Sequence, residues 1–301
     1  MFCYTVSMRT LSFTIEPDFD GCSVKDALSK KALVSDTLCS KLKRRKASVC
    51  LNGLPAYVTV SVHTGDILTV AVGDPEKDPT IRPMPFPLSV LYEDDDLVVI
   101  DKPNGLAVHP SRDPSEVTLE NSLAAYLTGT DNPHPVSRLD RGTTGLLTVA
   151  KSGWAHSWMK ELQHSGGMQK AYLAICTGIP EKEHDVIRAP IGYYEGSSYQ
   201  RIVRPDGAPS VTEYTLLSVQ DGLSLLRLIP HTGRTHQLRV HMAYIGHPLL
   251  GDWLYGKRDD RINRPALHAA ELAFIHPLTK QTIHLTSPLP EDMRSFFPFM
   301  V

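Results

Sequence analysis

The chain has 301 residues, of which 42% are hydrophobic and 21% are charged, a composition typical of a folded protein large enough for more than one domain. Its net charge of −2 and isoelectric point near 6.7 exclude a uniformly basic nucleic-acid-binding chain. No apolar run approaches the roughly 20 residues that span a bilayer, and residues 1–8 do not resemble a signal peptide. Five scattered cysteines without a C-x-x-C spacing predict free thiols in the cytoplasm.

A proline-rich stretch at residues 74–88 divides the chain. It contains five prolines among charged residues, and proline removes backbone donors and keeps its neighbours extended. We therefore expect a stiff linker here. It would separate a small module at residues 1–73 from a larger domain at residues 89–301.

The small module is expected to contain a strand, two helices and further strands. Ser23 and Ser35 are placed to cap the two helices. Residues 56–62 alternate as a strand does, Asn52-Gly53 marks a turn, and residues 67–72 form a last apolar strand. The second helix is expected to run into a basic cluster, which on charge alone is best interpreted as a solvated helix face. The cluster contains Lys41, Lys43, Arg44, Arg45 and Lys46.

The larger domain shows apolar strands broken by a few helices. Strands are expected at residues 97–100, 146–150, 170–176, 211–217 and 223–229. Apolar residues at helical spacing predict a helix around Leu119 and another around Trp154. Long strand pairs with few helices indicate an α+β sheet protein.

Residues 134–145 are the most informative segment, because a carboxylate, two arginines and two glycines lie there between apolar runs. Asp140 is expected in a turn, with Arg138 two residues before it. A lone aspartate in such a turn more often hydrogen-bonds its own backbone. The nearby arginines instead favour a charged carboxylate in a pocket for an anionic substrate.

A second cluster, at residues 231–241, supplies further cations. Helical spacing from Thr235 places His236 and Arg239 opposite the apolar stripe. A cation near a carboxylate favours its charged form, so Arg239 could hold Asp140 ionised; an ordinary structural ion pair fits the spacing equally well. The histidines of this cluster are five residues apart without a completing cysteine or acid pair, so a metal site is rejected.

The segment at residues 170–175 alternates as a half-buried strand does. Lys170 and Tyr172 then share one face. A tyrosine facing a cleft could stack on a flat base and accept or relay a proton. An ordinary half-buried strand tyrosine remains the alternative.

Several ordered motifs between residues 89 and 288 resemble the RluA-type RNA pseudouridine synthases. They are Tyr92-Glu93-Asp94, Asp101-Lys102-Pro103, Arg138-Leu139-Asp140, Lys170 with Tyr172, the run from Gly233 to His241, Gly246-His247-Pro248 and Leu267-His268-Ala269. The basic run, strand and Asn-Gly turn of the small module resemble the S4 RNA-binding module, which commonly precedes this catalytic domain. Ser137 and Thr144 depart from the family pattern, which usually has His and Ser there.

The resemblance implies an α+β pseudouridine synthase fold with a mixed, mainly antiparallel central sheet flanked by helices, preceded by a small S4-like α/β module. It implies that a uridine in structured RNA, ribosomal rather than transfer RNA, is flipped out, cut from its sugar and rejoined through C5. The reaction requires no cofactor and no metal. RNA is the expected partner of a monomeric, cytoplasmic enzyme.

The resemblance also implies roles for single residues. Asp140 would be the catalytic carboxylate, Arg239 its partner, and Tyr172 the residue that stacks on the base and accepts a proton. Leu267 would pack on the other side of the base, and Arg138 would fill the space that the uridine leaves. Further substrate contacts are expected from Lys102, Arg141, Lys170, Arg234 and His236, and RNA binding from the basic cluster of the small module.

Two other functions remain open at this point. The first is a non-catalytic RNA-binding or ribosome-assembly protein on the same fold, against which the intact Asp140, Tyr172 and Arg239 argue. The second is a carboxylate-based glycoside hydrolase, which needs a second acid at a suitable separation. The acidic run at residues 93–96 is a poor candidate, because it belongs to a turn that leads into a strand.

Overall fold

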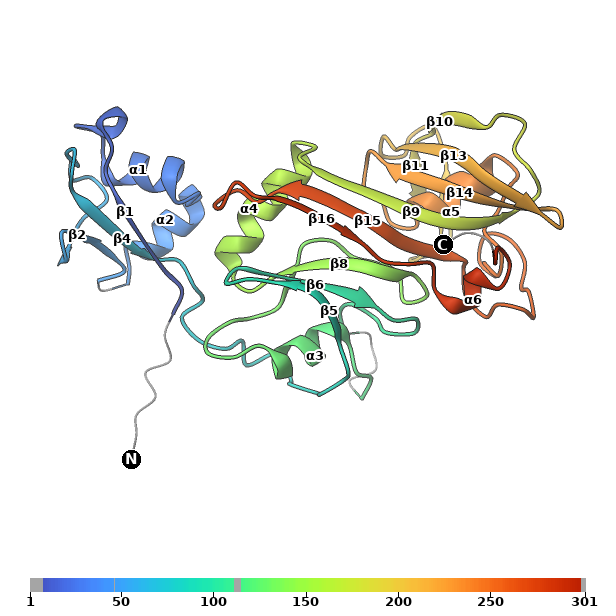
Figure 1. Cartoon of the computed structure of the whole chain (residues 1–301), viewed down its shortest axis with the longest axis horizontal. Coiled ribbons are helices and arrows are strands. Elements are labelled where there is room, and N and C mark those ends of the chain that lie inside the picture. Colours follow the sequence, from blue (N-terminus) through green and yellow to red (C-terminus); the bar gives the residue numbers. More distant parts are fainter. Residues whose placement is uncertain (1–7, 46, 111–114, 299–301) are drawn as a thin grey trace.

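The computed structural model describes residues 8–45, 47–110 and 115–298. Figure 1 shows a small N-terminal module beside a larger part that is built on one long sheet. Within the described ranges, no helix combines the length and the apolar character that crossing a membrane requires.

The small module contains four antiparallel strands in the order β1-β4-β2-β3, together with two helices. Ser23 and Ser35 cap the helices as predicted, because their hydroxyls accept hydrogen bonds from the backbone N–H groups of Asp26 and Leu38. The elements are β1 (Thr10–Thr14), a 3-10 turn (Pro17–Phe19), α1 (Val24–Lys31), α2 (Asp36–Leu42), β2 (Val49–Leu51), β3 (Leu54–Pro55) and β4 (Ile67–Ala71).

The strand expected at residues 56–62 is wrong. The carbonyls of Val58 and Val60 accept hydrogen bonds from the N–H groups of Lys25 and Val24, at 2.9 and 2.8 Å. The segment therefore satisfies the free donors at the start of α1 instead of pairing with the sheet. Its alternating pattern reflects valines that pack inward from an irregular segment.

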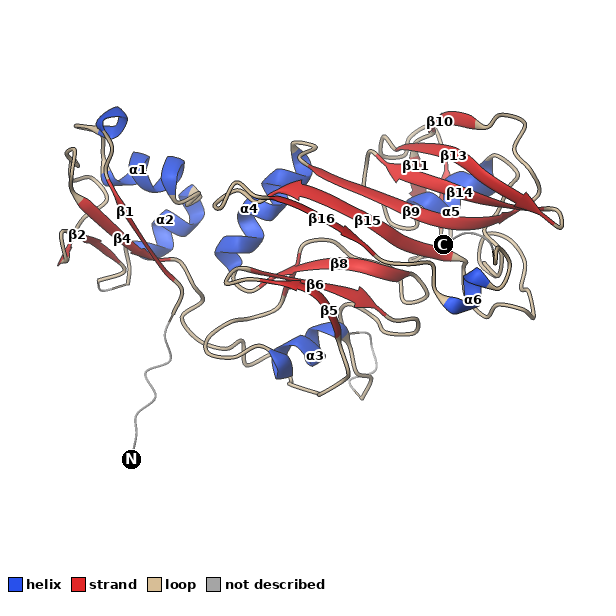
Figure 2. Ribbon diagram, in the orientation of Figure 1, coloured by secondary structure: helices blue, strands red, loops and turns tan. Residues whose placement is uncertain are grey.

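The larger part contains a ten-stranded sheet with the central order β10-β13-β14-β9-β15-β8-β6-β5. Neighbouring strands of the described chain pair antiparallel, except β15 and β8, which are parallel. The expected α+β class with a mixed, mainly antiparallel sheet is confirmed. Figure 2 shows few helices, with α3 near β5 and α4 at the end of the sheet that faces the small module.

The bounds of these elements follow the chain. The strands are β5 (Ser89–Glu93), β6 (Leu97–Lys102), β7 (His134–Pro135), β8 (Thr144–Ala150), β9 (Met168–Thr177), β10 (His184–Arg188), β11 (Ile191–Tyr193), β12 (Arg201–Val203), β13 (Val211–Gln220), β14 (Leu223–Pro230), β15 (Leu267–Ile275) and β16 (Thr282–Thr286). The helices are α3 (Leu119–Tyr126), α4 (Gly153–His164), α5 (Gln237–Tyr244) and α6 (Glu291–Arg294).

Strand β15 lies between β8 and β9, which follow one another along the chain. Gly145 at the start of β8 permits this close approach. Its φ is +102°, and a Cβ there would lie 2.3 Å from the carbonyl oxygen of Ala269 on β15. The sheet centre therefore combines residues that lie more than a hundred positions apart in the sequence.

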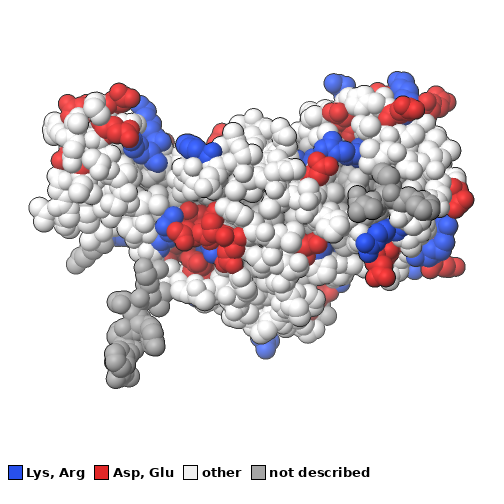
Figure 3. All heavy atoms as spheres, in the orientation of Figure 1, with Lys and Arg blue, Asp and Glu red and all other residues white. Residues whose placement is uncertain are grey.

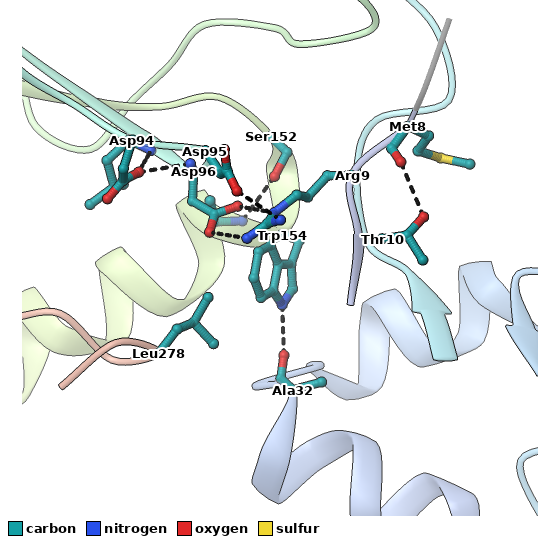
Figure 4. Close-up of polar contacts among 12 residues, drawn as sticks. Met8, Arg9, Thr10, Ala32, Asp94, Asp95, Asp96, Ser152, Trp154 and Leu278 are labelled. Atoms are coloured by element: carbon teal, nitrogen blue, oxygen red, sulfur yellow. Dashed lines mark hydrogen bonds and ion pairs between the residues drawn. The ribbon is translucent and has the colours of Figure 1, made fainter. Parts of the chain in front are cut away.

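The small module packs against the sheet at a junction shown in Figure 4. Trp154 on α4 is only 1% exposed, and its indole N–H donates to the carbonyl of Ala32 at 2.8 Å. Arg9 forms ion pairs with Asp95 and Asp96 at 3.0 and 2.9 Å. Residues 74–88, which connect the two parts, contain no helix or strand, and Asp74 and Lys77 hydrogen-bond to the larger part.

Candidate active site

A buried arginine lies between two carboxylates near the centre of the sheet. Arg239 on α5 donates from Nη1 to Asp140 Oδ2 at 3.0 Å, as expected from the sequence. It also donates from Nε and Nη2 to both oxygens of Asp252, at 2.7 and 2.8 Å. Burial opposes the charge on Arg239, but the two carboxylates outweigh it, so the pKa of Arg239 is raised. Asp252 is a second partner that the sequence analysis gave no role.

Two buried cations hold the loop that follows Asp140. Lys102 Nζ donates to the carbonyl of Arg141 at 3.1 Å and to two carbonyls of its own loop. Arg264 Nη1 donates to the carbonyl of Gly142 at 3.0 Å. Both cationic side chains are buried, so Asp140 projects from a backbone that is fixed just behind it.

The structure contradicts the expected substrate contact of Lys102, whereas that of Arg141 stays a prediction. Lys102 is buried, and its ammonium group donates to three backbone carbonyls, so no donor remains for a phosphate. Burial and then the nearby Arg264 lower the pKa of Lys102 to about 8. Arg141 is exposed, but it pairs with Glu116 and does not line the cleft beside Asp140.

Asp140 opens into a cleft of about 1300 Å³. Its described walls come from the loop before β8, from α4, β9, β14, β15 and β16, and from the start of α5. Six lysines and arginines face two acids in it: Arg138, Lys160, Lys170, Arg227, Arg234 and Arg239 against Asp140 and Glu271. On the face in Figure 3, one compact acidic group lies near the junction of the two parts, and acidic and basic side chains adjoin one another elsewhere. A chain of net charge −2 thus has a cationic cleft, which suits a polyanion.

Tyr172 and Leu267 line this cleft from the neighbouring strands β9 and β15. Burial and the negative charge of Asp140 raise the pKa of Tyr172 to about 12, so its phenol is protonated at neutral pH. Lys170, also on β9, donates to the hydroxyl of Ser137 at 3.0 Å. Burial, and then the nearby Lys160, lower the pKa of Lys170 to about 8. Ser137, which departs from the family pattern, thus holds a lysine of the cleft.

His236 precedes α5 and lies between Asp140 and Tyr255. The Tyr255 hydroxyl accepts a hydrogen bond from the backbone N–H of Arg201 at 3.0 Å and forms a second hydrogen bond with His236 Nδ1 at 2.8 Å. On the other side of the ring, His236 Nε2 lies 3.7 Å from Asp140 Oδ1. Burial is the main cause that lowers the pKa of His236, which favours the neutral ring. The imidazole of His236 thus lies near the second oxygen of Asp140.

Arg138 and Arg234 are exposed lining residues of the cleft. Arg234 donates to the carbonyl of Pro209 at 3.3 Å. Arg138 forms no hydrogen bond or ion pair with other described residues. Both guanidiniums are therefore accessible to a bound strand.

The basic cluster of the small module is only partly exposed. Helix α2 ends at Leu42, so the cations that follow it occupy a turn and not the expected helix. Lys41, Lys43 and Arg44 are exposed. Arg45 is half-buried and donates to the carbonyl of Gly73 at 3.4 Å, and Lys46 lies outside the described residues.

Glu271, the second acid of the cleft, forms an ion pair with Arg227. Glu271 accepts two hydrogen bonds from Arg227, at 3.1 and 2.7 Å. Asp140 and Glu271, the two acids among the described lining residues, are thus each paired with an arginine. A paired-acid glycoside hydrolase is therefore not supported.

Comparisons with known proteins agree with this arrangement. The profile of the RNA pseudouridylate synthase family matches residues 96–244, which include Asp140, Tyr172 and Arg239. The uncharacterized RNA pseudouridine synthase YjbO of Bacillus subtilis (strain 168) is 36% identical over 263 residues, or 86% of this chain and 93% of that protein.

Two further similarities extend this result. Ribosomal large subunit pseudouridine synthase D of Nitrosomonas europaea is 35% identical over 299 residues, or 95% of this chain and 86% of that protein. The solved structure of human RNA Pseudouridylate Synthase Domain Containing 1 is 29% identical, with a TM-score of 0.57 over 67% of this chain and 83% of that one. A non-catalytic RNA-binding protein is therefore set aside. The chain belongs to the RNA pseudouridine synthase family and is an isomerase of uridine in RNA.

Proposed function

We propose that this enzyme converts a uridine of large-subunit ribosomal RNA to pseudouridine in the cytoplasm, with Asp140 as its catalytic carboxylate. The position of Asp140 carries the proposal. Arg239 holds one of its oxygens, and the other faces a cationic cleft large enough for an extruded nucleotide. The relative from Nitrosomonas europaea is named for the ribosomal large subunit, which supports ribosomal RNA as the target.

The proposed reaction begins when the uridine leaves its stack, at a cost on the order of a few kcal/mol. Asp140 stabilises C1′ as the N1–C1′ bond breaks, and the bonding electron pair stays on the base. The base turns and C5 bonds to C1′. The proton that leaves C5 is balanced by the proton that N1 gains, so substrate and product have the same mass.

Residues around Asp140 take the supporting roles. Tyr172 stacks on the base and accepts the C5 proton, and Leu267 packs against the other side of the base. Arg138, which is exposed and unpaired among the described residues, fills the space that the uridine leaves. Lys170, Arg234 and His236 contact the substrate. These residues supply the chemistry without a cofactor or a metal.

The small module is proposed to bind RNA in the manner of an S4 module. Lys41, Lys43 and Arg44 are exposed, and cations at such positions gain affinity by releasing counterions from phosphates. We propose that a single chain acts as a monomer, with residues 1–73 on the RNA and residues 89–301 as the catalytic domain. Similarity to the Nitrosomonas enzyme over 95% of this chain supports a shared organisation.

The experiment replaces Asp140 by asparagine. Arg239 keeps its pairing with Asp252, so we expect Asp140→Asn to retain its fold and RNA affinity and to lose pseudouridine formation by about 10³-fold or more. The substrate is large-subunit ribosomal RNA from cells that lack the gene, and carbodiimide labelling detects pseudouridine. Glu271→Gln in the same cleft is the matched control and should stay active.

Two results would contradict the proposal. Near-normal turnover by Asp140→Asn would remove Asp140 as the catalytic carboxylate. Modification of transfer RNA from the same cells, with none in ribosomal RNA, would overturn the proposed target.

A further inference from the structure

The hairpin of β11 (Ile191–Tyr193) and β12 (Arg201–Val203) carries an aromatic surface that the reaction at Asp140 does not use. Tyr193, Tyr194 and Tyr199 are 57%, 48% and 58% exposed. Contact of large aromatic rings with water is unfavourable. Three exposed tyrosines within seven residues therefore form an unusual patch. We refer to residues 191–203 as the tyrosine hairpin.

The tyrosine hairpin is braced by arginines. Tyr193 and Arg201 are paired across the two strands, and the Arg201 guanidinium lies 3.5 Å from the centre of the Tyr193 ring. Arg204 donates to the carbonyl of Tyr193 at 3.1 Å and pairs with Asp206. The Tyr193 ring is therefore held in place by Arg201, which lowers the entropic cost of stacking on it.

The tyrosine hairpin is connected to the active site by short contacts. The Arg201 backbone N–H donates to the Tyr255 hydroxyl, and this hydroxyl is hydrogen-bonded to His236, which lies 3.7 Å from Asp140. Strand β12 also packs against α5, and Figure 1 shows β11 in the same region. An RNA strand that places a uridine at Asp140 therefore continues within reach of this surface.

We propose that the tyrosine hairpin is a stacking platform for unpaired RNA bases that flank the target uridine, with Tyr193 on Arg201 as its centre. The inference rests on the proposed function. Aromatic rings and guanidinium planes bind bases of unpaired RNA through stacking, with little dependence on sequence. The cationic cleft, to which the hairpin is connected through Tyr255 and His236, favours a polyanion over a protein as the occupant.

The test measures binding of fluorescein-labelled decauridine RNA to the full chain. Tyr193→Ala and Tyr199→Ala should each weaken binding about tenfold, because each variant removes the ring on which one base stacks. Tyr193→Phe and Tyr199→Phe keep the ring and should bind as the wild type does. Tyr126→Ala on α3, where the tyrosine is 44% exposed, is the matched control and should have no effect. Photo-cross-linking with 5-iodouridine in the same RNA should label residues 193–199.

The possible results separate this inference from the proposed function. Unchanged affinity of both alanine variants, with cross-links only elsewhere, overturns the stacking platform even if ribosomal RNA is modified normally. Tenfold weaker binding of the alanine variants, rescued by phenylalanine, supports the platform even if no RNA is found to be modified. A loss in the phenylalanine variants equal to that in the alanine variants would overturn stacking in favour of contacts made by the hydroxyls.

Discussion

At the scale of single residues, Arg239 balances the charge of the site throughout the proposed reaction. Its guanidinium bonds both Asp140 and the fully buried Asp252. If Asp140 bonds to the sugar, it loses its negative charge, and Asp252 still neutralises the arginine. A buried cation without any partner would cost several kcal/mol. Because Asp252 remains as a charged partner of Arg239, Asp140 can lose its charge without leaving a buried arginine unpaired.

Tyr172→Phe tests the proposed proton acceptor. Burial and Asp140 raise the pKa of Tyr172 to about 12, so the phenolate is a minor form at neutral pH. Below pH 12, the fraction of phenolate rises about tenfold with each unit increase in pH. If the phenolate accepts the C5 proton, the wild-type rate rises with pH between about pH 6 and 9. The Phe variant should bind RNA normally, react about 10²-fold more slowly or worse, and lose this dependence.

Single-turnover rates at several pH values provide the measurement, because they isolate the chemical step from product release. RNA affinity of the same variant is the control for stacking, which a phenyl ring preserves. Equal single-turnover rates for wild type and variant would exclude Tyr172 as the acceptor.

The residues of the site were predictable to different degrees. Asp140, Tyr172 and Arg239 lie in ordered motifs, and the structure brings them to one cleft. The orientation of His236 was not predictable, because it depends on the backbone N–H of Arg201 acting through a tyrosine hydroxyl. Lys102 was misassigned because a lysine beside a turn has the same sequence pattern whether it faces solvent or buried carbonyls.

At the scale of elements, burial decides which sequence patterns can be trusted. The continuous apolar run at residues 97–100 is fully buried in β6, as a strand covered on both faces requires. Residues 56–62 have an equally regular pattern but cover a helix end instead of joining a sheet. Alternation shows which side chains point inward, and it does not show what the backbone pairs with.

Lys102→Met tests the buried cation that holds the loop after Asp140. The variant leaves three carbonyls without their donor, so we expect a loss of about 3 kcal/mol or more in the free energy of unfolding at neutral pH. Urea denaturation measures this loss. Lys41→Met, at an exposed position, is the control and should change stability by less than about 0.5 kcal/mol.

The free energy of unfolding should depend differently on pH in the wild type and in Lys102→Met. The pKa of Lys102 is about 8 in the folded chain and about 10.4 in an unfolded one, so the unfolded state binds more protons between these values. The cost of burying the charge is therefore complete below about pH 8 and falls as the pH rises towards 10.4. The stability advantage of wild type over Lys102→Met should widen in this window, and a constant or shrinking difference would contradict the assigned burial.

At the scale of the whole molecule, the small module stabilises the catalytic part as well as carrying exposed cations. Removal of residues 1–73 would uncover Trp154 and leave Asp96 without Arg9. We expect the chain that starts at Asp74 to melt several degrees lower and to show red-shifted tryptophan fluorescence, because an exposed apolar ring and an unpaired acid both cost stability. Truncation should also weaken RNA binding more than it slows the chemical step.

A full-length control separates these two effects. Replacing Lys41, Lys43 and Arg44 by glutamine should leave the melting temperature unchanged, because all three are exposed. It should weaken RNA binding and reduce the slope of its salt dependence by up to about three, one for each phosphate that is no longer neutralised. Wild-type affinity with wild-type salt dependence would refute RNA binding by the small module.

The division of the chain at the proline-rich stretch was visible in the sequence, but the packing across it was not. Trp154 was correctly expected in a core. Its hydrogen-bond partner is a backbone carbonyl of the small module. Every residue has such a carbonyl, so the sequence does not indicate which one is used. Junctions of this kind depend on surface shape, which side-chain periodicity does not describe.

The central place of β15 has a consequence for the order in which the enzyme becomes active during translation. The ribosome makes residues 267–275 late, and until then β8 and β9 both present open edges. The nascent chain therefore holds two partial sheets, without Leu267 and without the arginine that fixes the loop behind Asp140. The site is therefore complete only after residues 264–275 have emerged and β15 has joined β8 and β9.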